Sequence, residues 1–586
     1  MTAPARTRRG CAWLVDDEAP GTLVTPEALS EEHRLIGRTA REFVDQEVAP
    51  SLADLERKDW DRARALVRAA GELGLLGTDV PERYGGTGLD KLASIIVAES
   101  LATPASFAST FGGQTNLSIL PLLCFGTPEQ KRRYVTRLAS GEIVGAYALS
   151  ESGAGSDARG VKTRATRQDD GSFRLDGEKM WITNGGFADL FIVFAKVDGD
   201  QFTAFIVERS SPGVATGKEE HKMGLHGSST TPLILQDAVV PADGLLGQIG
   251  QGHKVAFNTL NYGRLKLGAM CCGGAKLAIA EAARYAAERR QFGQPIARFG
   301  AIRHKLGEMI ARAYAVESMV YRTVGLIDGR LAGTGDEGDD LMQALDEFAI
   351  EASIAKVAGS EMIDYVLDEN VQIHGGNGYV EDYPAERQYR DARVNRIFEG
   401  TNEINRLLIP GLLVRRTLKG EFGLRDAVAR LSAKPSAATR ATGPLATQRA
   451  AVAGLKRVAI LVLSTAMQTF DARLSDEQEV LMRAADLLID AYGAESALLR
   501  AERAAHEANP AAALHRDAAA VFVEAATCRA AGTAGAALAA MVDGGRLTDL
   551  YGAARRHLPA EPVDTVAPRR RLADAQAGRR AYVFSI

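Results

Sequence analysis

The hydrophobic pattern of this 586-residue chain changes its period twice. From Ser30 to about residue 142, apolar residues recur at helical spacing behind a serine that has the form of a helix cap. From about residue 143, short β-rich runs such as "ADLFIVFAKV" and "FTAFIVERS" follow one another without a helical stretch between them. Helical spacing then returns over about 253–290, 299–329 and 339–373. The chain must therefore fold in an α–β–α order.

This order divides the chain into domains. We predict an N-terminal α-helical domain over 30–142, a central antiparallel β sandwich or barrel over 143–250, and an α-helical bundle over 251–415. The stretch "AKPSAATRATGPLATQ", rich in Pro, Ala and Thr, predicts a linker over 416–450. A second helical pattern then predicts a C-terminal α-helical domain over 451–586. The predicted fold class is α+β and multidomain.

The two ends of the chain differ from these domains. Residues 1–29 begin Arg-rich without a secretory core, so we expect a flexible N-terminal tail and a cytoplasmic protein. The chain from about 559 is rich in Pro and Arg, and we expect it to pack loosely. Within the C-terminal domain "SDEQ", Ser475 to Gln478, has the form of a capping box and predicts a helix start there.

Composition excludes several classes of protein. Hydrophobic residues make up 46% and charged residues 25%, which argues against disorder. A net charge of −4 gives no overall basic field, so we expect no nucleic-acid partner. The five cysteines include no CxxC pair and no zinc spacing, so we expect reduced thiols and no metal. The apolar run "AILVLSTAM" is too short for a membrane span.

Several motifs could carry chemistry, and each also has a structural reading. "SGAGSDARG" matches a relaxed dinucleotide fingerprint, but the run after it alternates like a strand, which disfavours a Rossmann unit. A glycine loop between strands can still present backbone N–H groups to a ligand. Trp181 in "KMWITNGG" is typical of a tryptophan in the hydrophobic core. His374 in "QIHGGNGY" is typical of a hydrogen-bonded structural histidine. In "ERRQFGQPI", the structural reading makes Arg289 a solvated charge and Phe292 a packing aromatic. The alternative is that Arg289 binds phosphate.

A single acidic residue, Glu399, stands in "RIFEGTNEINRLLI" directly before a predicted helix. Carboxylates are common in the first turn of a helix, where the helix dipole favours negative charge. A structural role is therefore the first reading of this residue taken alone.

Taken together and in this order, the motifs resemble the acyl-CoA dehydrogenase family. The resemblance covers Ser30 to about Pro410 and rests on "YALSESGAGSD", "MWITNGG", "YAAERRQFGQPI", "QIHGGNGY" and "RIFEGTNEI". The extra C-terminal block and the total length most resemble the very-long-chain branch, whose members carry an added domain.

The resemblance implies an activity. Family members bind FAD and oxidise acyl-CoA thioesters to trans-2-enoyl-CoA in fatty acid β-oxidation. Glu399 matches the base that takes the α-proton, while FAD N5 receives the β-hydride. Phe398 would keep the site dry, Gly400 would leave room for substrate, and burial would raise the pKa of the base. Another branch places its base at the position of Gly263, which cannot accept a proton.

The resemblance also implies contacts. The stretch from Tyr147 to Ser156 and Trp181 to Thr183 would cradle the flavin ring, with Thr183 near N5. Ser152 replaces the usual proline, which puts the stiffness of this loop in question. The implied cofactor contacts are Tyr147, Leu149, Ser150, Gly155, Ser156, Trp181, Ile182, Thr183, Arg289, Phe292, Gln372, Gly375, Gly376, Thr401 and Glu403. The implied substrate contacts are Ser156, Asn261, Arg264 and Gly400.

Partners and alternatives follow from the same resemblance. We expect an electron-transferring flavoprotein as electron acceptor and a homodimer in which some FAD contacts cross the interface. Small residues in "ATPASFASTFGGQT", Ala102 to Thr115, suggest a deep acyl tunnel and a long-chain preference, although helix packing also uses small residues. The C-terminal block could bind a membrane surface peripherally or enlarge the dimer. An acyl-CoA oxidase, a DNA-binding member and a non-catalytic assembly factor remain alternatives.

Overall fold

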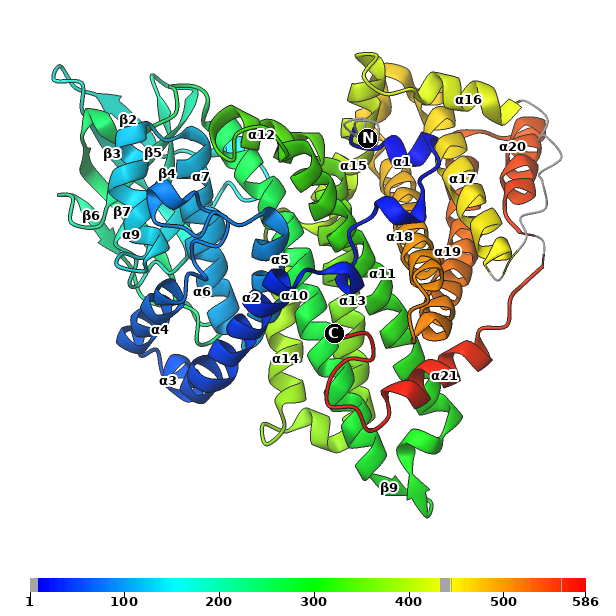
Figure 1. Ribbon diagram of the computed structural model, residues 1–586. Helices are drawn as coiled ribbons and strands as arrows, with labels where there is room; N and C mark the ends of the chain where they lie inside the picture. Colours follow the sequence, from blue (N-terminus) through cyan, green and yellow to red (C-terminus); the bar gives the residue numbers. More distant parts are fainter. Residues whose placement is uncertain (1–8, 433–442, 444, 560, 586) are drawn as a thin grey trace.

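A computed structural model describes residues 9–432, 443, 445–559 and 561–585 of the protein (Figure 1). The first helices and the β-sheet lie on one side, three long helices run through the middle, and the last helices form the opposite side. The predicted linker stretch at 433–448 falls largely outside the described residues. The described part of the 416–450 segment contains a short helix, α16 (Leu424–Ser432).

The N-terminal helices begin where the sequence predicts. The Ser30 Oγ accepts a hydrogen bond from the His33 N–H at 3.2 Å and caps the first of them. The helices that frame the site are α2 (Glu31–Phe43), α4 (Trp60–Glu72), α5 (Lys91–Ser100) and α6 (Ala105–Gln114). A π-helical turn, η3 (Val44–Val48), continues α2, and Ala40, Phe43, Val44 and Val48 are buried as the helical spacing predicts.

The central domain is one mixed sheet. Its strands are β1 (Gly145–Ala148), β2 (Arg164–Arg167), β3 (Phe173–Thr183), β4 (Leu190–Val197), β5 (Gln201–Glu208), β6 (Val214–Thr216), β7 (Thr230–Val240) and β8 (Leu245–Leu246). The order is β6-β7-β3-β2-β4-β5-β8, and β1 pairs with β4. The expectation of antiparallel pairing is wrong at two places, because β1 and β2 both run parallel to β4. Parallel pairing needs long connections, and the glycine loop after β1 is part of one of them.

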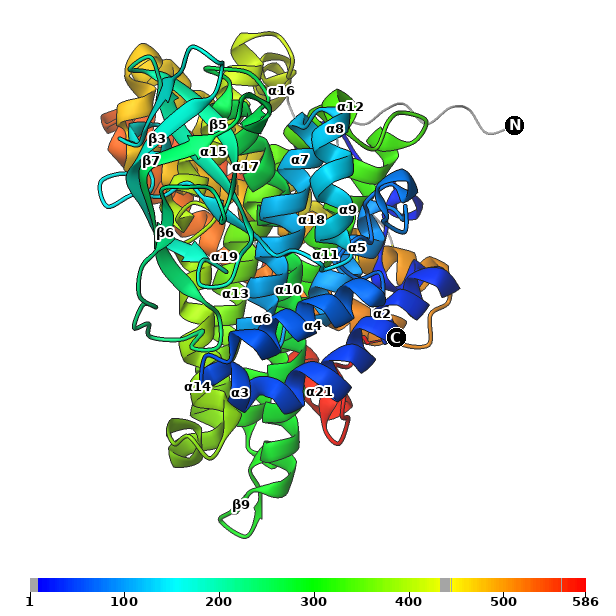
Figure 2. The ribbon, with the colours of Figure 1, turned by 90° about the vertical axis from the view of Figure 1, so that its left-hand side faces the viewer.

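Long helices form the predicted bundle. They are α10 (Gly252–Glu288), α11 (Gly300–Leu331), α12 (Gly338–Glu347), α13 (Ala349–His374) and α15 (Asn402–Leu418). The third predicted stretch is confirmed with one break, since Phe348 separates α12 from α13. A hairpin of β9 (Arg290–Gln291) and β10 (Gln294–Pro295) continues from α10 and projects below the rest of the molecule (Figure 2).

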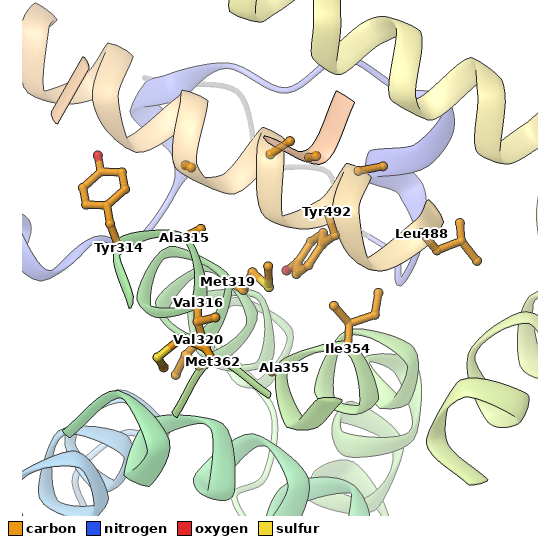
Figure 3. Packing of buried hydrophobic residues seen from close by; sticks show 14 of the residues in the cluster. Tyr314, Ala315, Val316, Met319, Val320, Ile354, Ala355, Met362, Leu488 and Tyr492 are labelled. Atoms are coloured by element: carbon orange, nitrogen blue, oxygen red, sulfur yellow. The ribbon is translucent and has the colours of Figure 1, made fainter. Parts of the chain in front are cut away.

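The C-terminal helices share one core with the bundle. They are α17 (Ala446–Phe470), α18 (Gln478–His506), α19 (Ala512–Met541), α20 (Gly544–His557) and α21 (Val566–Gln576). Met319 of α11 and Tyr492 of α18 meet in this core (Figure 3). The C-terminal block is therefore packed onto the bundle without a separating solvent layer.

One segment of this block differs from the sequence-based expectation about membranes. The helical stretch Ala446–Asp476 is long and apolar enough to cross a membrane by length and composition alone. The short run "AILVLSTAM" is only part of this longer stretch. Of its most apolar window, 72% is buried inside the protein, as expected for a core helix.

Both ends of the chain pack more firmly than expected. Trp13 is buried, and its Nε1 donates to the Glu351 carboxylate at 3.1 Å. The Glu27 carboxylate pairs with buried Arg500 of α18. The described residues of the predicted tail thus form a strap across the bundle and the C-terminal helices (Figure 1). At the other end Tyr582 and Phe584 are buried, so the loose C-terminus predicted from Pro and Arg content is wrong.

The predicted capping box is also wrong. Residues Asp471–Asp476 form a 3-10 turn, so Ser475 lies inside a turn and not at a helix start. Helix α18 begins at Gln478, and no side chain caps it.

Candidate active site

Glu399 lies in a short loop between α14 (Pro384–Ala392) with its 3-10 extension and α15. Its φ is 57°, a left-handed conformation that is strained for a residue with a side chain. Three donors hold the loop's carbonyls. The Arg264 Nε reaches the Glu399 oxygen at 3.2 Å, Lys356 Nζ reaches the Gly400 oxygen at 2.7 Å, and Asn405 Nδ2 reaches the Gly400 oxygen at 2.8 Å. These bonds fix where the carboxylate points.

The Glu399 carboxyl is poised for proton transfer. Its Oε2 is buried and has no hydrogen-bond partner within the described residues. Burial raises the pKa of Glu399 to about 7, against the opposing charges of Arg264 and Lys356. A carboxyl with this pKa changes protonation near neutral pH, which suits a general base.

Gly263 leaves room for that carboxyl. A Cβ atom at this position would lie 2.9 Å from Glu399 Oε2 and 2.6 Å from Asn116 Nδ2. The position at which another branch carries its base therefore directly faces the carboxyl of Glu399. Only glycine fits there while Glu399 occupies the space.

Arg264 and Asn261 support the loop from α10. Both are buried, and the Arg264 Nη1 donates to Asn261 Oδ1 at 3.1 Å. Burial lowers the pKa of Arg264 to about 10, while the nearby Glu399 opposes this shift. The Arg264 guanidinium thus contacts the main chain of Glu399, next to the position at which the resemblance predicts substrate.

The glycine loop after β1 forms a second wall. Tyr147 and Leu149 lie on and after β1, and the buried Tyr147 hydroxyl has no hydrogen-bond partner within the described residues. Burial and the charge of Glu399 raise the pKa of Tyr147, which places this ring close to the base. A side chain at Gly155 would meet nothing within 4 Å, so this loop borders open space together with exposed Ser156.

The loop is rigid although Ser152 replaces the usual proline. The carboxylate of Glu151 accepts hydrogen bonds from the Lys162 and Thr163 N–H groups at 2.6 and 3.1 Å. It also pairs with the Nζ of fully buried Lys179 at 2.7 Å. These bonds lower the pKa of Glu151, so the carboxylate stays ionised and anchors the loop.

Trp181 stands out from the sheet. A β-bulge interrupts the pairing of β3 with β7 between Lys179 and Ile182, and Trp181 has a φ of 59°. Its side chain is 60% exposed, so the local reading of a core tryptophan is wrong, whereas the cofactor contact implied by the resemblance stays a prediction. Its neighbour Ile182 is buried, whereas Thr183 lines the same cavity as Glu399. The bulge turns the indole out beside the site.

A cavity of about 440 Å³ begins at Glu399 and Thr183. Its wall near the base includes Phe398 and Asn116, and small residues of α6 line it further on. These are Ala105, Ala108, Ser109, Gly112 and Gly113. The cavity is thus a narrow apolar space with one ionisable carboxyl at its head.

The remaining predicted cofactor residues divide into two groups. The first group is near Glu399 in the sequence or on the glycine loop: Ser150, Thr401 and Glu403. The second group is at the far end of α10: Arg289, Phe292, Gln372, Gly375 and Gly376. Thr401 caps α15 by accepting the Ile404 N–H at 3.2 Å, and Ser150 and Glu403 lie near the base in exposed or half-buried positions. Arg289 follows Gly263 by 26 residues along α10, which is about 39 Å at the helical rise. This second group therefore lies far from Glu399 in the same chain.

The residues of the second group gather around the end of α10. Phe292 is 93% exposed on the hairpin, Gln372 is exposed in the last turn of α13, and Gly375 and Gly376 are exposed directly after it. His374 beside them donates from Nδ1 to the Asn370 oxygen at 2.8 Å and stacks on Tyr285. The structural reading of this histidine is confirmed.

Three features fit a flat heterocyclic cofactor: the Tyr147 hydroxyl without a partner within the described residues, the exposed Trp181 indole and the open glycine loop. Thr183, two residues after Trp181, lines the Glu399 cavity. Lys356 also helps to hold the Glu399 loop although it stands in none of the family motifs, and only its hydrogen bond to the Gly400 carbonyl reveals it. Fold and site together define a flavin-dependent oxidoreductase with a carboxylate beside the flavin space.

The chain belongs to the acyl-CoA dehydrogenase family. Family domains match it in four segments: the N-terminal domain over residues 30–142, the middle domain over 146–238, and two C-terminal domains over 250–411 and 454–556. It is a FAD-dependent acyl-CoA dehydrogenase of the expected fold with an added C-terminal helical domain.

Relatives of known name extend this assignment. The chain is 43% identical to a probable acyl-CoA dehydrogenase of Bacillus subtilis, with 97% of each chain covered. It is 38% identical to the human mitochondrial short-chain specific acyl-CoA dehydrogenase over 67% of this chain and 93% of that one. A solved acyl-CoA dehydrogenase of Bacillus anthracis, complexed with FAD, is similar with a TM-score of 0.96 and 44% identity, covering 98% of this chain and 100% of that one.

Proposed function

We propose that the protein oxidises long-chain acyl-CoA thioesters to trans-2-enoyl-CoA, in fatty acid β-oxidation, with Glu399 as the base. The observation that carries this proposal is the buried Glu399 Oε2 at the head of an apolar cavity, on a carboxyl whose pKa is about 7. An α-C–H of a thioester is weakly acidic, so its removal requires such a base in a dry site.

The chain's own residues account for the proton transfer. The Glu399 carboxylate takes the α-proton on Oε2, while Arg264, Lys356 and Asn405 hold its loop in place. The Glu399 N–H donates to no group within the described residues, which leaves it free to polarise the thioester carbonyl. Gly400 has a φ of 78°, a left-handed conformation that favours glycine. FAD, when bound, accepts the β-hydrogen as a hydride.

The cavity supports a preference for long chains. Small residues at Ala105, Ala108 and Gly112 leave the space beyond the base open, where larger side chains would shorten it. The short-chain human relative covers only 67% of this chain, so its name does not decide the chain length. The added C-terminal domain fits the very-long-chain branch, which the sequence also resembles.

The second group of predicted FAD residues supports a homodimer. Phe292 and Gln372 are exposed near the end of α10, and this end lies about 39 Å along the helix from Gly263, which faces Glu399. A second copy that brings these residues to the flavin space of the first would complete the cofactor site. We infer that an electron-transferring flavoprotein reoxidises the enzyme. We also infer that the Arg-rich C-terminal segment from about residue 559 binds no nucleic acid.

An anaerobic titration of the flavin-loaded protein tests the proposal. We expect palmitoyl-CoA to bleach the visible flavin band more completely and more rapidly than octanoyl- or butyryl-CoA. Glu399→Gln, which keeps the shape of the side chain, should retain FAD and lose bleaching by at least about 1,000-fold. A fully active Glu399→Gln variant would remove Glu399 from the mechanism.

An acyl-CoA oxidase is the second candidate, because it would use the same base and cofactor. Rapid reoxidation of the substrate-reduced protein by oxygen would favour it. Slow reoxidation by oxygen, together with rapid reoxidation by an electron-transferring flavoprotein, would favour the dehydrogenase.

A further inference from the structure

The cavity that begins at Glu399 also reaches the surface at its other end. Four residues of α10 line the cavity along its length: Gly263, Met270, Gly274 and Glu281. Gly263 and Glu281 are 18 residues apart on this helix, or about 27 Å along its axis. The lining ends at Asp45 and Ala49, and both residues are exposed to solvent.

Three elements surround this far end. They are η3 with η4 (Ala49–Ser51), the start of α6, and α14. Figure 2 shows α6 and α14 close together at this end of the molecule. The wall there includes the small residues Ala102, Ala105 and Gly274 beside larger apolar ones such as Leu52 and Leu277, and one cavity joins this wall to exposed Asp45 and Ala49.

The rim of the far end is polar. Arg41 of α2 is half-buried, and its guanidinium forms no ion pair within the described residues. Among the described residues, Arg387 forms an ion pair only with Glu56, at 4.0 Å. Glu281 accepts a hydrogen bond from Gln388 at 3.0 Å, and burial raises its pKa. A closed acyl pocket would end in apolar side chains, whereas this one ends in charges that meet water.

We propose that this end is a port through which the distal end of a long acyl chain leaves the protein. The port consists of Arg41, Asp45, Ala49, Glu281 and Arg387. The proposal rests on the proposed function, because it takes acyl-CoA as the ligand and Glu399 as the inner end. Its substrate class is acyl-CoA whose chain spans the passage and ends in a methyl or a polar group such as a carboxylate.

The length of the passage supports this assignment. A bilayer core of about 30 Å is two acyl chains thick, so one membrane-type chain spans about 15 Å. A passage of about 27 Å therefore takes such a chain fully, and a longer chain reaches the rim. A carboxylate at the chain end is costly inside the apolar passage but not at the wet rim beside Arg41 and Arg387.

A labelling experiment detects the port without turnover. In a Cys528→Ser background, which removes the exposed thiol, Ala49→Cys places a thiol at the port. We expect eicosanoyl-CoA to slow the maleimide reaction of this thiol at least fivefold, and butyryl-CoA to leave it unchanged. Ala53→Cys is the matched control, because Ala53 is exposed on the next helix and does not line the cavity.

Substrate comparison gives a second readout. The kcat/KM of each ω-carboxy acyl-CoA is divided by that of the methyl-ended acyl-CoA of equal length. We expect this ratio to be below one hundredth for dodecanoyl chains and to rise above one tenth for eicosanoyl chains. A closed pocket would keep the ratio below one hundredth at every length.

The outcomes separate the port from the proposed function. Protection of Ala49→Cys by eicosanoyl-CoA without any flavin bleaching would support the port and overturn the dehydrogenase activity. If eicosanoyl-CoA bleaches the flavin but does not protect Ala49→Cys, the port is overturned and the activity stands. The same holds if the kcat/KM ratio stays below one hundredth at every chain length. Equal protection of Ala53→Cys would also overturn the port, because the effect would not be confined to it.

Discussion

The Glu399 carboxyl links burial to chemistry at the scale of one residue. Its pKa is about 7 because its burial outweighs the attraction of Arg264 and Lys356. Only the ionised form can take a proton, so activity must rise with pH through this value. We expect kcat/KM to fall about tenfold per pH unit below pH 6 and to level off above pH 8. A profile flat from pH 5 to 9, measured by stopped-flow flavin reduction, would contradict this assignment.

Gly263 gives a second test at the residue scale. In Gly263→Ala the new Cβ would overlap Asn116 Nδ2 at 2.6 Å and press on Glu399 Oε2 at 2.9 Å. The carboxyl must move, and we expect the flavin reduction rate to fall at least about tenfold with FAD retained. Gly411→Ala on α15 is the control, because a Cβ there meets nothing within 4 Å. Equal rates in Gly263→Ala and the wild type would show that the carboxyl does not need this space.

Residues differ in how well the sequence predicts them. Glu399 and Thr183 stand in motifs, and the structure places both on one cavity. Lys356 could not be found in this way, because its amine meets the Gly400 carbonyl from 44 positions away and no local pattern marks it. The local pattern at Trp181 favours a core residue, which is wrong because a bulge turns the side chain outward and composition carries no signal for a bulge. The resemblance instead implies a cofactor contact for Trp181, which stays a prediction.

The loop that carries Glu399 is the element on which the site depends. Lys356 on α13 binds the Gly400 carbonyl and Asn402 Oδ1, both at 2.7 Å, and its charge favours the ionised Glu399. We expect Lys356→Met to move the midpoint of the pH–rate profile upward by up to about one unit, besides lowering the rate. A purely structural lysine would lower the rate without moving the midpoint. Lys196→Met on β4, where the amine pairs with exposed Asp200, should change neither.

The bounds of helices with strong hydrophobic periodicity were predicted closely, whereas the direction of strand pairing in the sheet was not. Helix α11 covers Gly300–Leu331 against a prediction of 299–329, because its apolar stripe is repeated over many turns. The parallel pairing of β1 with β4 could not be predicted, because period-two alternation is the same in parallel and antiparallel strands. The sheet pairing positions the glycine loop, so this part of the site depended on information that the local sequence lacks.

At the scale of the whole molecule, ion pairs join the N-terminal strap to the added helical domain. Arg500 of α18 is fully buried and binds Glu27 of the strap at 2.5 Å and Glu317 of α11 at 2.6 Å. Arg322 similarly joins Glu18 and Glu495. The sequence alone predicts a flexible tail here. It cannot reveal the partners of Glu18 and Glu27, because these lie hundreds of residues further along the chain. Its carboxylates neutralise buried arginines of both helical domains, so strap, bundle and C-terminal block should unfold together.

Replacing Glu27 with Gln tests this coupling. Removing one charged partner of buried Arg500 should cost about 2–3 kcal/mol of unfolding free energy, while Glu31→Gln at an exposed position of α2 should cost nothing measurable. The pKa of Glu27 is lowered to about 2 from 4.5, so its stabilisation is complete above pH 4.5 and is lost as pH falls towards 2. The stability gap between wild type and Glu27→Gln should therefore narrow below pH 4.5. Chemical denaturation followed over this range would contradict the coupling if the gap were absent at pH 7 or constant with pH.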